Sequence, residues 1–484
     1  MSKALIRPER WWPALAIALA GKSCLLLLML IEHGTPIDGP WYLFGGDAIG
    51  YLDPIDALLN GHGYRPDHRM PGYGAPYLLL RIFMERPAAL QSLVLLHVLA
   101  SSIAVVLLAR LAFNLTNDQR IFRWTFWLAL ISTYASFYDR QILTESFSVM
   151  ALTLAAQQST TWFKNGRRSH LLFAGSAITW LIFMKPVYLP ALAILGAAVL
   201  LHRGTAFRSR ILATLALGVP FLVVDGAWCV RNAVMHGEFR PLTDGAIYPD
   251  LRAGIKYPLL RLMQAYGTSF IWWDPAAEIR WFNIRYGNDG QVQFADRQPP
   301  LPAYVYTDQC PQDSLRAIAE AVEHYNNSAD EAQRTSIITN VTTRCDRCIE
   351  SFRNEHPFHY HVTARLRMLK TFLLHSGTSA LMGKPGNELD PVRLAVRAFY
   401  SFLYLGSFLL GSIWAIRSLL KRSVAPDLRL TSALLLYGVT IFPFGVRMTE
   451  FRYSTAIYPL ALLLAILFGI SLWERIRSRT RGAA

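Results

Sequence analysis

The sequence predicts an all-α polytopic membrane protein with about 10–12 transmembrane helices, surface helices in the first outer loop and a small, mainly helical extracytoplasmic domain. Three observations predict this class. The 484 residues are 53% hydrophobic and only 17% charged, whereas a soluble domain is roughly 45–50% apolar and about 25% charged. The apolar residues form long runs. The Lys and Arg residues cluster at the ends of those runs.

The net charge of +15 is explained by membrane topology rather than by nucleic acid. No zinc-finger or RNA-binding pattern accompanies the basic residues. If the N-terminus is cytoplasmic, alternate loops are basic, as the positive-inside rule requires, and the opposite loops hold the acidic and mixed residues. We therefore expect a multi-pass protein of a bacterial inner membrane, with both termini cytoplasmic and its chemistry on the periplasmic face.

Ten apolar segments are candidate spans. The first is expected to be a retained helix, because its apolar core is too long for a cleaved signal peptide. The fifth and sixth are shorter than the roughly twenty residues of a spanning helix, so one of them could be re-entrant. The candidates are residues 12–32, 88–112, 122–138, 142–163, 170–184, 187–202, 211–230, 395–417, 429–446 and 453–473.

These spans define three parts. Residues 1–230 form an N-terminal transmembrane catalytic module whose first outer loop is 33–87. Residues 231–394 are too polar to span and are expected to form the extracytoplasmic domain, since 314–345 show helical periodicity. Residues 395–484 hold the last helices. The Trp-rich segment 269–282 could lie on the membrane surface or fill the core of the outer domain.

Cys345 and Cys348 form a Cys-x-x-Cys pair in the outer domain. In an oxidising compartment they are a disulfide candidate. Three histidines downstream, His356, His359 and His361, leave a zinc site open as an alternative. A redox-active role would need a thioredoxin-like context, which the surrounding sequence lacks.

Three carboxylates are candidate catalytic groups. Asp47 and Tyr51 recur at helical spacing just outside the first span, so Asp47 would begin a surface helix at the membrane boundary. There it could act as a general base toward an acceptor hydroxyl or simply cap the helix. Asp139 and Glu145 stand at the outer end of a span, where ionisable groups are costly unless they face a cavity. Asp139 could instead form only a surface pair with Arg140.

A set of cations lies on the outer face, where topology does not require positive charge. Arginine binds phosphate bidentately, so an anionic lipid headgroup is the expected partner. The alternative is generic headgroup contact. The candidate phosphate ligands are Arg65, Arg69, Lys185, Arg447 and Arg452, and Arg231-Asn232 ends another span.

Several short motifs, taken in order, resemble the GT-C superfamily of membrane glycosyltransferases. They are Asp47-x-x-x-Tyr51, Gly61-x-Gly63-Tyr64, Arg69-x-Pro71-Gly72-Tyr73, Thr144-Glu145, Lys185-Pro186, Trp228-x-x-Arg231-Asn232 and Arg452-Tyr453. The resemblance is to the dolichyl-phosphate-mannose-protein mannosyltransferase-like and aminoarabinose-transferase-like bacterial groups. It covers the chain to about residue 245 and the last spans, but not the outer domain. Gly74 departs from the pattern, where Pro is usual.

The resemblance implies a function and a set of roles. It implies inverting transfer of a sugar from a polyprenyl-phosphate donor to an extracytoplasmic glycan, lipid or protein, with no cofactor or metal. Asp47 would be the general base, Arg69 rather than Arg65 the main phosphate ligand, and Glu145 the second acidic residue, with Asp139 as the alternative. Such folds have eleven to thirteen spans, which suggests a further span near 255–275. Expected substrate-binding residues are Tyr51, Tyr64, Tyr73, Arg231 and Asn232.

Two other function classes stay open. A transporter or flippase of an anionic lipid-linked substrate would use the same outer cations, although inverted repeats and interrupted midplane helices are not evident. A ligase that joins glycans from a lipid diphosphate would carry its chemistry in a large late loop.

Overall fold

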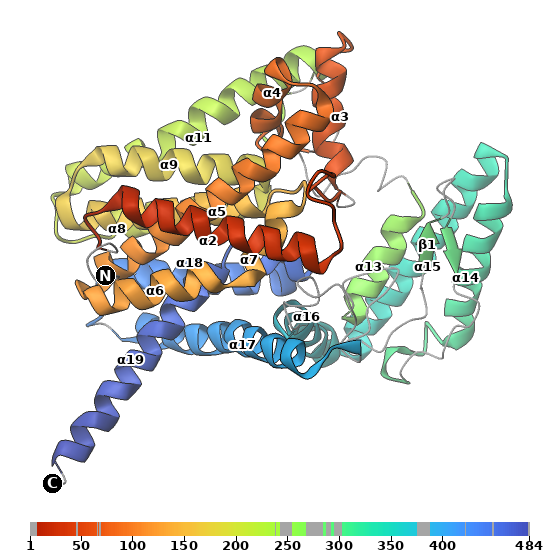
Figure 1. Ribbon diagram of the computed structural model, residues 1–484. Helices are drawn as coiled ribbons and strands as arrows, with labels where there is room; N and C mark the ends of the chain where they lie inside the picture. The colour runs from red at the N-terminus through yellow and green to blue at the C-terminus, as the bar shows by residue number, and fades with distance from the viewer. Residues whose placement is uncertain are drawn as a thin grey trace. The chain divides into compact units, whose positions relative to one another are not determined.

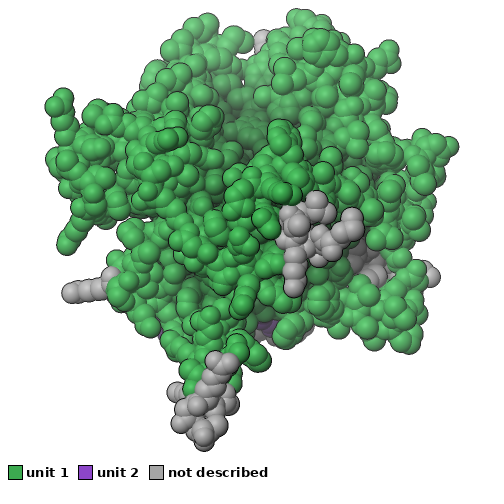
Figure 2. Space-filling view, turned by 60° about the vertical axis from the view of Figure 1, so that its left-hand side comes forward, with its two compact units in different colours: residues 1–245, 375–438, 454–484 green, residues 246–374, 439–453 purple. Residues whose placement is uncertain are grey.

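A computed structural model describes residues 7–44, 47–64, 66, 69–237, 239–242, 254–267, 284–286, 292–294, 303–374, 388–421, 423–447 and 450–482. These residues are almost entirely helical (Figure 1), which confirms the predicted all-α polytopic class. They pack as two compact units. Unit 1 comprises residues 1–245, 375–438 and 454–484, and unit 2 comprises 246–374 and 439–453. Figure 2 shows a face formed largely by unit 1.

Unit 1 is a helical bundle built around α5, whose long apolar run is buried along most of its length. Helices α2, α6 and α8 pack against α5, and α9 joins α8 to α11. The helices of this unit are α2 (Trp11–Glu32), α3 (Ala48–Leu59), α4 (Gly74–Phe83), α5 (Arg86–Thr116), α6 (Gln119–Ile131), α7 (Thr133–Phe137), η1 (Tyr138–Arg140), α8 (Glu145–Asn165), α9 (Arg168–Met184), η2 (Pro186–Tyr188), α10 (Leu189–Leu200), α11 (Phe207–His236), α17 (Pro391–Leu420), α18 (Pro426–Thr440) and α19 (Tyr458–Gly482).

Six helices in the described part of the chain are long and apolar enough to cross a membrane, and they match six of the ten predicted spans. The other four predicted spans are also helical, but they are shorter or more polar. The prediction of one helix over 122–138 is wrong, because the extended backbone of Ser132 separates α6 from α7. The six are Trp11–Glu32, Arg86–Thr116, Phe207–Met235, Pro391–Leu420, Pro426–Val446 and Tyr458–Ser478.

Glycines allow two pairs of helices in unit 1 to approach backbone to backbone. A Cβ at Gly175 of α9 would lie 2.1 Å from the carbonyl oxygen of Leu217 in α11. A Cβ at Gly411 of α17 would lie 2.4 Å from the carbonyl oxygen of Ala461 in α19. Small residues at such crossings are typical of helix packing in membranes, where close contact replaces the hydrophobic effect.

Unit 2 has its own hydrophobic core, formed mainly by α13, α14 and α15. The periodicity predicted over 314–345 becomes two helices, because Asp330 begins α15 by accepting a hydrogen bond from Ala332 N (3.0 Å). The predicted span near 255–275 includes the short α13, and its part after Gly267 lies outside the described residues. So does the Trp-rich segment. The elements are α13 (Lys256–Tyr266), β1 (Ile284–Tyr286), β2 (Val292–Phe294), η3 (Ala303–Val305), α14 (Gln312–Asn327), α15 (Glu331–Glu355), η4 (His359–Thr363), α16 (Ala364–Leu373), η6 (Ile441–Val446) and η7 (Phe451–Ser454).

The predicted Cys345–Cys348 disulfide is wrong. Cys348 is bonded to Cys310, with a Cα–Cα distance of 5.2 Å, and Cys345 is a free, buried thiol. Both residues of the Cys-x-x-Cys pair lie on the continuous helix α15, and Cys348 meets the loop that precedes α14 instead. The zinc alternative fails as well, because Cys348 is not available as a thiolate. The Cys345 thiol is completely buried, and burial raises its pKa, as is typical of structural cysteines.

Candidate active site

The Asp47 carboxylate is paired with the guanidinium of Arg69. Asp47 occupies the N-cap position of α3, but its side chain makes no capping hydrogen bond. Arg69 Nη2 donates to Asp47 Oδ1 instead, and both side chains are partly exposed. The helix-cap interpretation is therefore wrong for this side chain. Arg65, the other arginine of this loop, lies outside the described residues.

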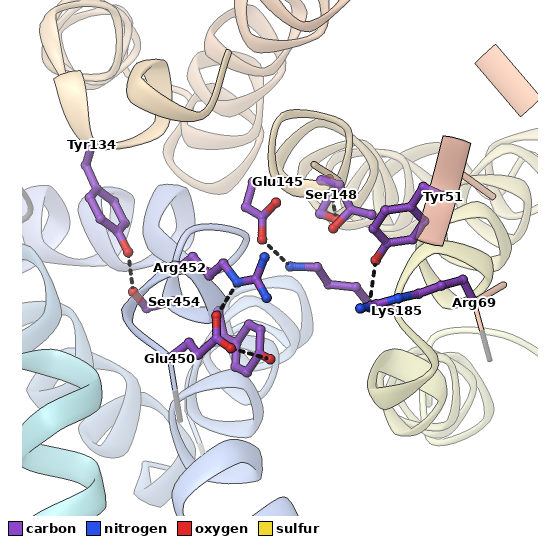
Figure 3. Close-up of polar contacts among 11 residues, drawn as sticks. Tyr51, Arg69, Tyr134, Glu145, Ser148, Lys185, Glu450, Arg452 and Ser454 are labelled. Carbon is purple, nitrogen blue, oxygen red and sulfur yellow. Dashed lines mark hydrogen bonds and ion pairs between the residues drawn. The ribbon is translucent and has the colours of Figure 1, made fainter. Parts of the chain in front are cut away.

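Tyr51 fixes the orientation of Arg69. It lies one turn beyond Asp47 on α3, and its hydroxyl accepts a hydrogen bond from Arg69 Nη1 at 3.4 Å (Figure 3). The Arg69 guanidinium carbon also lies 4.9 Å from the centroid of the Tyr51 ring, which is a cation–π distance. Helix α3 thus presents a carboxylate and an aromatic ring to one guanidinium, which explains the spacing of the two residues.

A second ion pair joins Glu145 to Lys185 (Figure 3). Glu145 begins α8 and is 1% exposed, and Lys185 lies in the break between α9 and η2. Lys185 Nζ donates to Glu145 Oε1 at 2.9 Å. The other carboxylate oxygen, Oε2, is buried and has no hydrogen-bond partner among the described residues. A buried carboxylate with one unsatisfied oxygen is an uncommon arrangement that points to function.

A backbone contact brings the loops of the two ion pairs together. Gly72 N donates to Phe183 O at 3.0 Å, and Trp180 Nε1 donates to Gly72 O at 2.9 Å. A Cβ at Gly72 would lie 2.5 Å from the carbonyl carbon of Phe183, so only glycine fits here. Gly72 is three residues from Arg69, and Phe183 is two residues from Lys185. The contact therefore fixes the two cation-bearing loops relative to each other.

An apolar groove of about 310 Å³ lies against the same contact. Its walls come from the first loop, α4, α9 and α11. The lining is almost entirely carbon, apart from the hydroxyls of two residues of α9 and the indole nitrogen of Trp180. The lining residues are Pro71, Gly72, Ala75, Ser176, Thr179, Trp180, Phe183, Pro220 and Val224.

Tyr73 packs between the two ion pairs and is completely buried. Its ring lies 5.1 Å from the Tyr51 ring on one side and 6.0 Å from the Phe147 ring of α8 on the other. Burial, and then the negative charge of Glu145, raises the pKa of Tyr73 well above its usual value. Tyr73 was predicted to bind substrate, but the structure places it in the packing behind the site.

His97 of α5 holds Tyr73 in place. His97 Nδ1 lies 3.2 Å from the carbonyl oxygen of Asp139, and Nε2 lies 3.3 Å from the Tyr73 hydroxyl. A carbonyl can only accept, so Nδ1 carries the proton and Nε2 accepts from Tyr73. Sequence reasoning missed His97, because a single histidine in a long apolar run carries no pattern.

Asp139 and Arg140 are both buried and do not form the surface pair considered above. Asp139 accepts a hydrogen bond from Ser146 Oγ at 2.7 Å, next to Glu145, and its charge is opposed by Lys22 of α2. Arg140 Nε donates to Trp41 O at 3.0 Å. This hydrogen bond holds the beginning of the first outer loop against η1. Asp139 therefore supports the start of α8.

Arg231 anchors the far part of the first outer loop. Its Nη2 donates to Tyr64 O at 2.6 Å, and its guanidinium carbon lies 4.9 Å from the Trp228 ring. Burial, opposed in part by Arg231, raises the pKa of Tyr64 to about 12. Asn232 is buried, and its Nδ2 donates to Arg240 O at 2.9 Å. The Trp-x-x-Arg-Asn motif thus connects the end of α11 to this loop.

The two remaining predicted phosphate ligands belong to unit 2. Arg452 forms an ion pair with Glu450 (Figure 3) and lies over the Tyr453 ring, 5.4 Å from its centroid. Arg447 donates to the hydroxyl of Tyr360. The two arginines thus differ within one unit, because only Arg452 has a carboxylate partner among the described residues.

No protein-family model matches the sequence, and no curated protein matches it either. Among solved structures, the chain is similar to the archaeal oligosaccharyltransferase AglB from Archaeoglobus fulgidus, in complex with an inhibitory peptide and a dolichol-phosphate. The sequences are 12% identical, and the TM-score is 0.45 over 96% of this chain and 52% of that one. The chain thus spans about half the length of that enzyme. A likeness at this level does not identify a family.

Proposed function

We propose that this membrane protein is a glycosyltransferase that moves a sugar from a polyprenyl-phosphate donor to an extracytoplasmic glycan, lipid or protein. One observation carries the proposal. Two cation–carboxylate pairs, Arg69–Asp47 and Lys185–Glu145, come from loops joined by the Gly72–Phe183 contact, beside an apolar groove. A lipid-linked phosphate needs cations for its headgroup and an apolar surface for its chain.

The ion pairs suggest how donor binding prepares the base. A donor phosphate competes with Asp47 for the Arg69 guanidinium and with Glu145 for Lys185. When the phosphate takes the guanidinium, the Asp47 carboxylate is released and can accept the proton of an acceptor hydroxyl. Tyr51, which contacts Arg69 by its ring and its hydroxyl, keeps the guanidinium directed at the phosphate during this exchange.

The proposed reaction is a single displacement. The acceptor oxygen forms a bond to the anomeric carbon as the bond from that carbon to the phosphate oxygen breaks, with inversion. The acceptor proton goes to Asp47, and the electron pair of the broken bond stays on the phosphate. Arg69 and Lys185 stabilise that developing charge. The reaction as proposed uses no cofactor.

The orientation in the membrane is part of the proposal. Loops that hold Asp47 and Glu145 are the acidic and mixed ones, opposite to the basic loops. This distribution supports an active site on the periplasmic face of a bacterial inner membrane. There it would meet a polyprenyl carrier and envelope acceptors.

Donor binding tests the phosphate site directly. Undecaprenyl phosphate is titrated into purified full-length protein in nanodiscs, and affinity is compared between the parent chain, Arg69→Ala and Arg86→Ala. Loss of a hydrogen-bonded charge costs about 1.5–3 kcal/mol, so Arg69→Ala should weaken binding about 10- to 100-fold. Arg86, an exposed arginine at the start of α5, serves as the control. Unchanged affinity in Arg69→Ala would remove this residue from the phosphate site.

Turnover separates the enzyme from a transporter. Mass spectrometry of envelope glycans and lipids, with and without the protein, identifies the sugar and the acceptor. Purified protein in detergent should then form the new glycosidic bond from a polyprenyl-phosphate sugar. A flippase would move the same lipid across a bilayer but form no bond in detergent, and that result would refute the proposed function.

A further inference from the structure

Two guanidinium groups of unit 2 face one aromatic ring. The guanidinium carbons of Arg447 and Arg365 lie 4.8 Å and 5.8 Å from the centroid of the Tyr360 ring. Arg447 Nη1 also donates to the Tyr360 hydroxyl. None of the ion pairs found among the described residues includes either arginine. Two positive charges therefore share one ring without a carboxylate from the described part of the chain.

Arg365 has the greater need for a compensating charge, because it is only 2% exposed. Its Nε donates to Tyr360 O at 3.3 Å and its Nη2 to Gln264 O at 2.7 Å. Carbonyl groups satisfy these donors but supply no net negative charge, and a buried cation without one is destabilised. Burial, and then the charge of Arg447, lowers the pKa of Arg365 to about 10.

Some other arginines of unit 2 have carboxylate partners. Arg452 is paired with Glu450, and Arg261 Nη1 lies 2.8 Å from Asp346 Oδ1. Unit 2 therefore contains carboxylates that pair with arginines, although none of those described pairs with Arg365 or Arg447.

The backbone around Tyr360 and Arg447 is unusual on both sides. Tyr360 lies in the π-helix η4, and Arg447 directly follows the π-helix η6. Single-turn π-helices are rare and occur frequently at functional sites. Arg447 also has φ +58°, in the left-handed region that non-glycine residues seldom adopt. Such strain persists only where the surrounding structure enforces it.

Aromatic packing fixes the start of the η6 segment that leads to Arg447. The Phe442 ring of η6 stacks on the Tyr453 ring at 4.8 Å and packs against the Phe372 ring of α16 at 5.6 Å. Phe442 is buried. Aromatic packing thus holds the start of η6, and the hydrogen bond from Arg447 to the Tyr360 hydroxyl holds its other end.

We propose that Arg447 and Tyr360, with Arg365 behind them, form a binding site for a phosphate dianion. Arg447 presents the remaining donors of its planar fork, which match the geometry of phosphate. The Tyr360 hydroxyl accepts from Arg447 and directs its own proton to the same phosphate. Arg365 supplies a second fixed positive charge. A phosphomonoester or a diphosphate balances both charges, whereas a carboxylate balances only one.

This inference goes beyond the proposed sugar transfer, which requires only the cations of unit 1. The sequence placed Arg447 among the phosphate ligands from its position at a helix end. The structure adds Tyr360 and Arg365, which no sequence pattern connected to it.

Anion titration of the full-length protein in nanodiscs tests the site. Inorganic pyrophosphate is the probe. An Arg69→Gln background removes the guanidinium of the donor site proposed in unit 1. Arg447→Gln is expected to lower pyrophosphate affinity about 10- to 100-fold, since it removes a charge-assisted contact, and Tyr360→Phe about 2- to 10-fold. Arg447→Lys should retain part of the affinity, because it keeps the charge but loses the fork.

Arg353→Gln is the matched control, because Arg353 is an exposed arginine of the same unit. The proposal is overturned if pyrophosphate binding disappears in the Arg69→Gln background, if Arg447→Gln binds as well as the control, or if the control loses as much. Thermal unfolding of each variant separates loss of the site from loss of the fold, and an unfolded Arg447→Gln is replaced by Arg447→Lys and Tyr360→Phe.

Competition by undecaprenyl phosphate, placed in the nanodisc, then distinguishes a lipid headgroup from a soluble phosphate. Either result supports the site. If sugar transfer fails but binding at Arg447 is retained, only the proposed transfer is refuted. If transfer occurs and Arg447→Gln has no effect on anion binding, only the inference fails.

Discussion

Two groups of cations, one in each unit, differ in their partners. In unit 1, Arg69 and Lys185 are each paired with a carboxylate, whereas in unit 2 the cluster of Arg365 and Arg447 has none among the described residues. An anion that binds a paired cation must displace a protein carboxylate, and that carboxylate is then available for proton transfer. An anion that binds the cluster of Arg365 and Arg447 displaces no carboxylate of the described residues. The first arrangement suits catalysis, and the second suits recognition.

The largest expected effect concerns the carboxylate that binding would release. Asp47→Asn should lower the initial rate of sugar transfer about 10²- to 10⁴-fold, the range of general-base catalysis, while the protein stays folded in the membrane. Asp53→Asn is the control, because Asp53 lies on the same helix and is exposed. Near-normal transfer by Asp47→Asn would show that the Asp47–Arg69 pair is only structural.

The next effect concerns the buried Lys185–Glu145 pair, and it tests whether the fold requires a cation beside this carboxylate. Lys185→Met leaves Glu145 as an uncompensated buried charge, which should cost about 3–5 kcal/mol in the free energy of unfolding. Adding Glu145→Gln should recover most of that loss, as a double-mutant cycle would report. Thermal unfolding measures both, with the exposed Lys421→Met as control. If Lys185→Met destabilises the protein no more than the control does, Lys185 is not needed to compensate the buried charge of Glu145.

A smaller effect on stability is expected from the disulfide of unit 2. Cys310→Ser opens a disulfide that joins residues 38 positions apart, which should cost this unit about 2–4 kcal/mol. Cys345→Ala should leave the disulfide in place, as thiol counting after denaturation would show. Protease sensitivity under non-reducing conditions reports the stability. Loss of the disulfide in Cys345→Ala, with retention in Cys310→Ser, would restore the Cys345–Cys348 pairing.

The smallest effect concerns the contact between the cation-bearing loops of unit 1. Gly72→Ala forces a Cβ against the Phe183 carbonyl and should cost about 1–3 kcal/mol, as overpacking does. It should also raise KM for the donor, because Arg69 moves relative to Lys185. Gly226→Ala of α11 is the control, since nothing lies within 4 Å of that Cβ. Equal behaviour of the two variants would show that the contact does not organise the site.

The sequence by itself determined most of the helices and the residue types of the candidate site. Runs of apolar residues predict spans because burial in lipid depends on composition over about twenty positions. The periodicity of 314–345 predicts helices for a similar local reason. The sequence also identified Asp47, Arg69, Glu145 and Lys185, because each lies in a short local motif that can be recognised without the fold.

Only the tertiary structure decided which groups meet. Arg69 pairs with a residue 22 positions away, Lys185 with one 40 away, and Arg447 with one 87 away. The same is true of Cys310 with Cys348, and of His97 with Tyr73. Secondary structure follows from neighbours along the chain, whereas these contacts depend on how helices pack. No local pattern records that packing.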